Sequence, residues 1–231
     1  PIFVNREYYA TVLKAITSKF YNRSDLVIDD ADTITFIRQT LESGSEQEII
    51  HILRLIRFQQ ADVINDALTE KLLQHKSESI RDEMLTLALA GFIHIPAEPI
   101  QQMLADETIP LLQRQKAFTA LYNTKAEEQL IFTYITDNDP FIQSRALGKF
   151  LANPSSEYYA NAVIMVDDFI ISEDPKSRMI AAMAIAVSKK DNFKDQLIQL
   201  MDDSKNVVAA AAIKSAGNWP DEELAIAVLK H

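Results

Sequence analysis

The stretch EDPKSRMIAAMAI, residues Glu173–Ile185, places an Asp, a Pro and an Arg directly ahead of an alanine-rich apolar segment. Asp174 is of a residue type that caps helix N-termini by accepting backbone N–H bonds, and Pro175 suits the first helical position, where its missing N–H costs nothing. The apolar residues behind Arg178 recur with the 3.6-residue period of a helix. We therefore interpret the Asp/Arg pair as helix architecture rather than as a catalytic or binding site.

Helix starts of this kind recur upstream at a nearly constant interval. Arg145 lies 33 residues before Arg178. Arg114 lies another 31 residues earlier, and Arg81 another 33. Each Arg opens an apolar segment of helical period, and Val207–Ile213 continues the series without an Arg. The third residue after the Arg is small in three of the four copies, which indicates that neighbouring helices approach one another closely.

Further segments of helical period lie between and around these helices. The sequence predicts helices over Asn5–Phe20, Asp32–Leu41, Glu46–Phe58, Asp62–His75, Pro99–Ala105, Glu127–Ile135, Tyr158–Ile170, Asn192–Met201 and Asp221–Leu229. Helix pairs that repeat every 30 to 33 residues cannot bury their apolar faces singly, but a stack of pairs forms one continuous core. We therefore expect an all-α fold, an α-α superhelix in which about six helix pairs form a repeat solenoid.

We expect one continuous array over residues 1–231. Residues 1–30 form a leading helix and the segment that follows it, residues 31–220 form the helical repeats, and residues 221–231 form a trailing helix. No shift in composition marks a linker. Two prolines within Phe92–Pro99 interrupt the rhythm and predict a bend of the array at that place.

The composition excludes several kinds of protein. The chain has 231 residues, of which 48% are apolar, and only 4 Gly and 8 Pro, as expected for long helices with tight connections. Its formal net charge is −10; phosphate backbones repel such a surface, so we expect no nucleic-acid partner. Because the chain has no Cys, disulfides and thiolate-based catalytic or metal sites are excluded.

The sequence contains no segment suited to direct membrane insertion. The longest stretch without Asp, Glu, Lys or Arg is Met84–Ala97, and its 14 residues fall short of the ~20 apolar residues that a membrane span needs. No signal peptide is visible. The chain begins with PIFV (Pro1–Val4) rather than with Met, so we interpret it as a piece of a longer protein or as a processed chain.

The opening stretch resembles a known repeat signature. DPKSRMIA (Asp174–Ala181) is similar to the Asp-Pro-x-Val-Arg-x-x-Ala pattern of HEAT repeats. Ser77–Arg81 carries this pattern with Ser in place of Asp, and Asp139–Arg145 carries it with the Arg displaced by two positions. The resemblance covers roughly residues 30 to 231. It implies that Asp and Arg side chains of successive repeats hydrogen-bond along the stack, in a structural ladder that includes Arg81, Arg114, Asp139, Arg145, Asp174 and Arg178.

The N-terminal part carries a second resemblance. REYY (Arg6–Tyr9) opens a helix, LVIDD (Leu26–Asp30) follows, and LESG (Leu41–Gly44) precedes the next helix. This order looks like the start of the HEAT segments fused behind bacterial membrane domains of the ATP/ADP translocase-like nucleotide-transporter type. The resemblance implies a cytoplasmic regulatory or adaptor segment of a larger inner-membrane protein. Its partner would be another protein or neighbouring domains of the same chain.

Residue types that carry chemistry do not form a recognisable site. None of the four histidines, His51, His75, His94 and His231, has a second His at i+4 or an adjacent Glu. We interpret the acidic doublets as solvated caps near helix N-termini, where the helix dipole favours acids; they are Asp29–Asp30, Glu127–Glu128, Asp167–Asp168, Asp202–Asp203 and Glu222–Glu223. A Ser/His/Asp triad stays open, because its members need not be close in sequence. We expect no cofactor, no bound metal and no enzymatic activity.

Two functions are compatible with this pattern. The first is a non-enzymatic protein-interaction or regulatory scaffold. The alternative is a HEAT-like enzyme that acts on nucleic acid or on a tetrapyrrole-type substrate, which requires a convergent polar pocket on the concave face. The acidic balance and the single tryptophan argue against the nucleic-acid enzyme, because we expect Trp219, beside Pro220, to pack at the end of the stack.

Candidate partner-binding residues follow from the solenoid geometry, in which the second helix of each pair usually lines the concave face. Those helices carry five cations that would bind an acidic helix or tail if they gather on one face, and that are otherwise solvated: Arg54, Arg57, Lys116, Lys149 and Lys214. In the doublets Tyr8–Tyr9 and Tyr158–Tyr159 we expect one ring to face the core. The other ring would lie near the surface, as a candidate for an interface.

Overall fold

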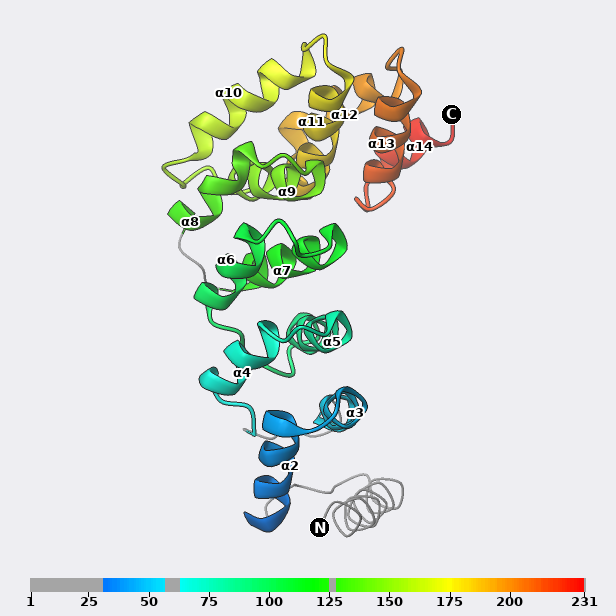
Figure 1. Ribbon diagram of the computed structural model, residues 1–231. Coiled ribbons are helices and arrows are strands. Elements are labelled where there is room, and N and C mark those ends of the chain that lie inside the picture. The colour runs from blue at the N-terminus through cyan, green and yellow to red at the C-terminus, as the bar shows by residue number, and fades with distance from the viewer. Residues whose placement is uncertain (1–30, 57–62, 125–127, 231) are drawn as a thin grey trace. The chain divides into compact units, whose positions relative to one another are not determined.

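The computed structural model describes residues 31–56, 63–124 and 128–230, and every regular element in these ranges is a helix (Figure 1). The α-helices are α2 (Ala31–Ser43), α3 (Glu46–Ile56), α4 (Asp66–Leu73), α5 (Glu78–Leu89), α6 (Ala97–Ala105), α7 (Leu111–Asn123), α8 (Glu128–Phe132), α9 (Pro140–Leu151), α10 (Tyr159–Ile170), α11 (Pro175–Ser188), α12 (Lys194–Met201), α13 (Asn206–Ala216) and α14 (Glu222–Val228). Two 3-10 helices, η1 (Thr133–Thr136) and η2 (Asp191–Phe193), join them. The predicted all-α fold class is confirmed.

The chain divides into two compact units, which we describe separately. Unit 1 covers Pro1–Ala120 and unit 2 covers Leu121–His231, so that the boundary falls inside α7. The predicted leading helix, Asn5–Phe20, lies outside the described residues. The continuity of the array across the two units stays a prediction.

Unit 1 is built from helix pairs that pack on the next pair along the chain. Helix α2 packs on α3, and α4 packs on α5. Between pairs, α3 packs on α5, α2 on α4, and α4 on α6. The buried side chains at these contacts include Ile52, Leu53, Ile80, Leu85 and Ile100. Burying one such side chain contributes about 1.5–3 kcal/mol, so contacts within and between pairs both stabilise the unit.

Unit 2 repeats this arrangement around an alanine-rich helix. Helix α11 packs on both α9 and α13, α10 packs on α9 and α11, and α12 packs on α13 and α14. Ala181, Ala182 and Ala184 of α11 are fully buried, and Trp219 is buried directly after α13. Because α11 has neighbours on several sides, its small residues set how closely the helices of unit 2 approach.

Asp174 and Asp139 cap the helices that the sequence predicts to begin behind them, whereas α6, α10, α12 and α13 have no side-chain cap. Asp174 accepts hydrogen bonds from the backbone N–H groups of Lys176 and Ser177 at the start of α11. Asp139 caps α9 in the same way, through the N–H of Ile142. Each cap satisfies backbone donors that have no partner inside the helix, which stabilises a helix by about 1 kcal/mol.

Several helix boundaries differ from the sequence-based expectation. The helix expected over Asp62–His75 begins only at Asp66, because Asn65 takes the cap position and accepts the N–H of Leu68. The segment expected as one helix over Glu127–Ile135 is described as α8 followed by η1. The helix expected over Asn192–Met201 is likewise η2 followed by α12.

Gly148 in α9 marks a close approach of α9 to α11. A Cβ atom built on Gly148 would lie 2.5 Å from the Val187 Cβ and 2.7 Å from the Ala184 carbonyl oxygen, both in α11. Backbone and Cβ atoms cannot move aside as a flexible side chain can. The small residue that the repeat pattern places in α9 is therefore required by the contact with α11.

We predict that Gly148→Ala destabilises the protein by about 1–3 kcal/mol, because the added methyl group overpacks the α9–α11 contact. Urea unfolding followed by circular dichroism measures this difference. Gly217→Ala is the matched control, since a Cβ there meets no atom closer than 3.6 Å and φ is −60°. Equal stability of the two variants would contradict the close approach at Gly148.

Candidate functional site

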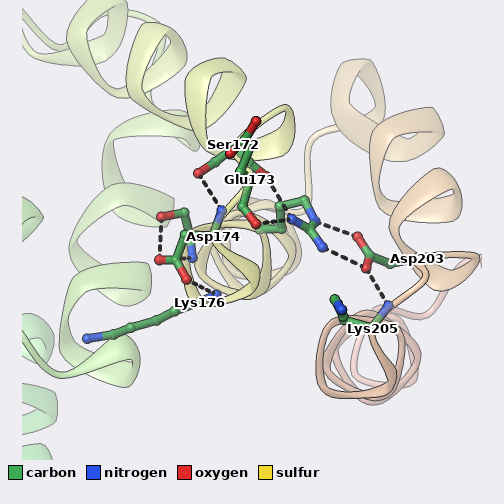
Figure 2. A network of polar contacts seen from close by, with 8 residues as sticks. Ser172, Glu173, Asp174, Lys176, Asp203 and Lys205 are labelled. Carbon is green, nitrogen blue, oxygen red and sulfur yellow. Dashed lines mark hydrogen bonds and ion pairs between the residues drawn. The ribbon is translucent and has the colours of Figure 1, made fainter.

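Arg178 forms the centre of a polar network that joins two consecutive helix pairs. Figure 2 labels its partners Ser172, Glu173 and Asp203. Its Nε and Nη2 atoms donate to the two carboxylate oxygens of Asp203 at 2.6 Å and 3.0 Å. Its Nη1 atom donates to the backbone carbonyls of Ser172 and Glu173 at 2.7 Å and 3.1 Å. Because Asp203 lies between α12 and α13, one guanidinium ties the start of α11 to the connection that precedes α13.

The Arg178–Asp203 contact is shielded from solvent and electrostatically favourable. The two side chains are only 13% and 9% exposed. The hydrogen bond from Arg178 lowers the pKa of the Asp203 carboxyl, and the backbone N–H of Lys205 adds to this. The same hydrogen bond raises the pKa of Arg178. A bidentate Arg–carboxylate pair fixes geometry as well as energy, so this contact sets the register of α11 against α13.

Arg81 makes an equivalent contact in unit 1 with a neutral partner. Its Nη1 donates to the carbonyls of His75 and Lys76, which precede it by the same numbers of residues as Ser172 and Glu173 precede Arg178. Its Nε donates to the Gln113 side chain in α7 at 3.1 Å, and Gln113 in turn donates to the carbonyl of Glu78. Arg81 in unit 1 and Arg178 in unit 2 therefore each connect two consecutive helix pairs.

Arg145 and Arg114 are placed differently. The Arg145 guanidinium lies 4.5 Å from the centre of the Phe141 ring, within the same helix. The residue four positions after Asp139, where α11 has Arg178, is Gln143, and its buried side chain donates to the carbonyl of Ile135. Arg114 donates to the carbonyl of Leu104, at the end of α6 in its own helix pair.

The two aspartates of the predicted ladder have local contacts. The Asp174 carboxylate accepts hydrogen bonds from the backbone of Lys176 and from the backbone and hydroxyl of Ser177, and these bonds lower its pKa. The contact of this turn with the preceding helix pair comes from Lys176, whose Nζ donates to the carbonyl of Asn138 at 2.8 Å. Asp139 caps α9.

Asp203 is the residue that the sequence argument missed. We interpreted the doublet Asp202–Asp203 as solvated, and for Asp203 this is wrong, because its carboxylate is nearly buried against Arg178. The position of Asp203 along the chain could have indicated a structural role. Asp203 stands in the connection before α13, just as Glu173 and Asp174 stand before α11.

Asp167–Asp168 is solvent-exposed, as we expected for the acidic doublets, but it lies at the other end of its helix. We expected such doublets near helix N-termini, but these two residues lie in the last turn of α10, where the helix dipole disfavours negative charge. Both are exposed. Glu222 and Glu223 do lie in the first turn of α14. Asp29–Asp30 and Glu127 lie outside the described residues.

Lys194 makes the corresponding contact at the C-terminal end of unit 2. Its Nζ lies 2.6 Å from an Asp221 carboxylate oxygen, and farther from Asp191 and Glu223, at 3.6 Å and 3.7 Å. The hydrogen bond between Lys194 and Asp221 raises the pKa of Lys194 and lowers the pKa of Asp221. Asp221 also caps α14 through the N–H of Leu224, so this pair joins α12 to α14.

Most of the predicted partner-binding cations that the structure describes contact the protein itself. Arg54 of α3 pairs with Glu83 of α5 at 3.3 Å, and Lys116 of α7 pairs with Asp82 of α5 at 2.6 Å. Lys149 lies 5.2 Å from the centre of the Tyr122 ring, and its burial lowers its pKa.

Lys214 is exposed, and Arg57 lies outside the described residues. Arg54 and Lys116 belong to unit 1, and Lys149 and Lys214 to unit 2. The gathering of these cations on one face stays a prediction.

Aromatic side chains cluster beside α9. The Tyr158 ring stacks on Phe132 with centroids 4.2 Å apart and meets Phe150 edge-on at 5.3 Å. Tyr158 and Tyr159 are both half-buried, so this doublet does not divide into one core ring and one surface ring as we expected. Tyr8–Tyr9 lies outside the described residues.

Within the described ranges, no group of three or more His, Asp or Glu side chains is placed to hold a metal ion. His75 accepts the backbone N–H of Ser77 through Nδ1, and His94 is exposed. His51 is half-buried, and His231 is not described.

A shallow depression lies between α12 and α14. Its volume is about 540 Å³, and it is lined by Ile198, Asp221, Glu222, Glu223, Ile226, Ala227 and Lys230. It is open to solvent, and the Asp221 carboxylate beside it is already bound to Lys194. Besides Asp221, its polar lining consists of Glu222, Glu223 and Lys230, next to the apolar Ile198, Ile226 and Ala227.

Neither protein-family models nor curated proteins gave a match to this chain. Of the helices that the structure describes, none combines the length and the apolar character needed to cross a membrane.

We predict that Arg178 and Asp203 are thermodynamically coupled. Arg178→Ala and Asp203→Ala should each lower the thermal midpoint, and the double variant should lower it by less than the two changes added together. Arg178→Lys should also lower it, because one ammonium cannot replace the guanidinium fork. Arg54, whose side chain is 67% exposed in its pair with Glu83, is the control: Arg54→Ala should change stability by no more than about 1 kcal/mol. Additive effects of the two alanine substitutions would contradict the coupling.

We further predict a specific acid dependence. The pKa values of Asp174, Asp203 and Asp221 are lowered from 3.8 in the folded protein, so their contribution to stability is complete above that pH. It is lost as the pH falls below 3.8 through the lowered values. Thermal midpoints measured from neutral to acid pH should fall less steeply for Asp203→Asn than for the wild type. Parallel curves would contradict the lowered pKa of Asp203.

Proposed function

We propose that this chain is a non-enzymatic protein-interaction or regulatory scaffold of HEAT-like repeats. The observation that carries the proposal is the use of its partly buried ionic side chains. Three of these cations bind an acid outside their own helix: Arg178 binds Asp203, Lys194 binds Asp221, and Lys116 binds Asp82. Such contacts hold the helices in register. The charged side chains that form them are already paired within the protein and are not placed to bind a substrate.

Exposed apolar side chains support the same proposal. Ile164, Ile171 and Leu112 are large apolar residues with more than half of their surface exposed to solvent. A single exposed apolar residue is common on protein surfaces, but neighbouring exposed apolar residues that form a patch are typical of protein-binding sites. The enzyme alternative requires a convergent polar pocket, which the open depression between α12 and α14 does not provide.

We also propose that the chain acts as the cytoplasmic segment of a larger membrane protein of the nucleotide-transporter-like type. The resemblance that suggests this runs through Arg6–Tyr9 and Leu26–Asp30, outside the described residues, and ends in Leu41–Gly44 at the end of α2. A segment in this position would couple neighbouring domains of the same chain or bind a regulatory protein.

The test of this proposal uses the native parent protein. An antibody raised against the 231-residue chain is applied to membrane and soluble fractions of the source cells, with and without chemical crosslinking. We expect a membrane-bound band far larger than 26.1 kDa and a crosslinked adduct with a second protein or domain. A soluble band near 26.1 kDa would refute the transporter context, and the absence of any adduct would refute the scaffold.

A further inference from the structure

Helix α10 exposes an unusual amount of apolar surface. Most of its residues are apolar, yet only Ala162 and Val166 are buried. Ile164 is 62% exposed, and Ile171, directly after the last helical turn, is 82% exposed. Because seven residues make about two helical turns, these two side chains lie on the same face, about 10 Å apart along the axis. The contacts of α10 with α9 and α11 leave this face uncovered.

Two carboxylates lie between these isoleucines. Asp167 and Asp168 are both exposed, and among the described residues their side chains have no hydrogen bond or ion pair. The chain from Phe150 to Pro175 contains no Lys or Arg, so no cation of this segment offsets them. Glu157 and Glu173, also exposed, add to the negative charge around the face.

The position of Asp167 and Asp168 is unfavourable for α10 itself. Acids in the last turn of a helix face the negative end of the helix dipole, which is unfavourable for each negative charge placed there. Two other acids of this protein illustrate how a carboxylate stabilises the fold. Asp203 binds Arg178, and Asp221 binds Lys194 while it caps α14. The α10 doublet has neither role, so the fold alone does not account for it.

We propose that the α10 face, defined by Ile164, Asp167, Asp168 and Ile171, docks a cationic amphipathic helix of a partner protein. The apolar residues of that helix would cover Ile164 and Ile171, and its Lys or Arg side chains would pair with the two carboxylates. An occupant of this chemistry offsets the charge at the end of α10, whereas phosphate-rich nucleic acids and anionic lipid surfaces would be repelled by it. This inference rests on the proposed scaffold function and assigns the partner class and the surface.

The direct test is a titration of the purified 231-residue chain with a fluorescein-labelled peptide. The peptide is a designed helix with Leu at i, i+4, i+7 and i+11 and with Lys or Arg on both sides of the apolar stripe. Fluorescence anisotropy at low and high salt measures its affinity. We expect binding that weakens with salt, and no binding of a peptide in which Glu replaces every Lys and Arg.

Substitutions on the α10 face locate the binding. The double substitution Ile164→Ser and Ile171→Ser should lower the affinity for the peptide roughly tenfold, which corresponds to a loss of about 1.4 kcal/mol of binding free energy at an apolar hot spot. The double substitution Asp167→Asn and Asp168→Asn should lower the affinity for the peptide and make that affinity depend less on salt concentration. The matched control is Leu112→Ser with Glu107→Gln, since Leu112 is 64% exposed and Glu107 is an exposed acid, both outside α10. Circular dichroism checks that every variant is folded.

Several outcomes would overturn the assignment. Equal peptide affinity of the wild type and the α10 variants would place the binding elsewhere. Self-association in sedimentation that is lost in the Ile164/Ile171 variant would assign the face to a second copy of the chain. Binding to anionic vesicles that is lost in the same variant would assign it to a membrane.

The inference and the proposed function can fail separately. The crosslinked adduct expected for the parent protein is tested again in cells that express the Ile164/Ile171 variant. An adduct that forms equally in the variant would leave the scaffold function standing and refute the α10 assignment. The absence of an adduct even in the wild type would refute the scaffold function itself.

Discussion

Within each unit, the described helix pairs bury apolar side chains against neighbouring pairs, and the second helices of consecutive pairs pack directly on one another. In unit 1, α3 packs on α5, and in unit 2, α11 packs on both α9 and α13. The contact demands small residues. Gly148 lies so close to Ala184 and Val187 that one added carbon would overlap them. Close helix packing therefore supplies most of the stability, and it also restricts which residues each repeat can carry.

Polar contacts set the register that close packing leaves undetermined. Apolar surfaces of alanine and leucine tolerate sliding, whereas a guanidinium bound to a carboxylate and two carbonyls has one geometry. Arg178 has this geometry with Asp203, and Arg81 has a neutral version of it with Gln113. A neutral hydrogen bond is weaker than an ionic one but costs less to desolvate, so a repeat can exchange one for the other without changing the fold.

The acidic side chains fall into two kinds: those that are paired with a cation inside the protein, and those that are exposed without such a partner among the described residues. Asp82, Asp203 and Asp221 each bind a cation of another helix, and such acids keep the helices in place. Asp167 and Asp168 lie instead on an exposed helix face between two exposed isoleucines, at the helix end that disfavours them. A local arrangement that opposes the stability of its own helix is best understood through a contact outside the fold.

The sequence by itself determined the all-α class, the repeat period and most helix starts, since a cap acts within three or four residues of the helix that it begins. Asp174 and Asp139 cap α11 and α9 for this reason. Only the tertiary structure decided that Arg178 binds Asp203, that Gln143 donates to the carbonyl of Ile135, and that Asp167 and Asp168 face solvent. These facts depend on how consecutive pairs stack, which follows from side-chain volumes at many positions at once. No local pattern encodes them.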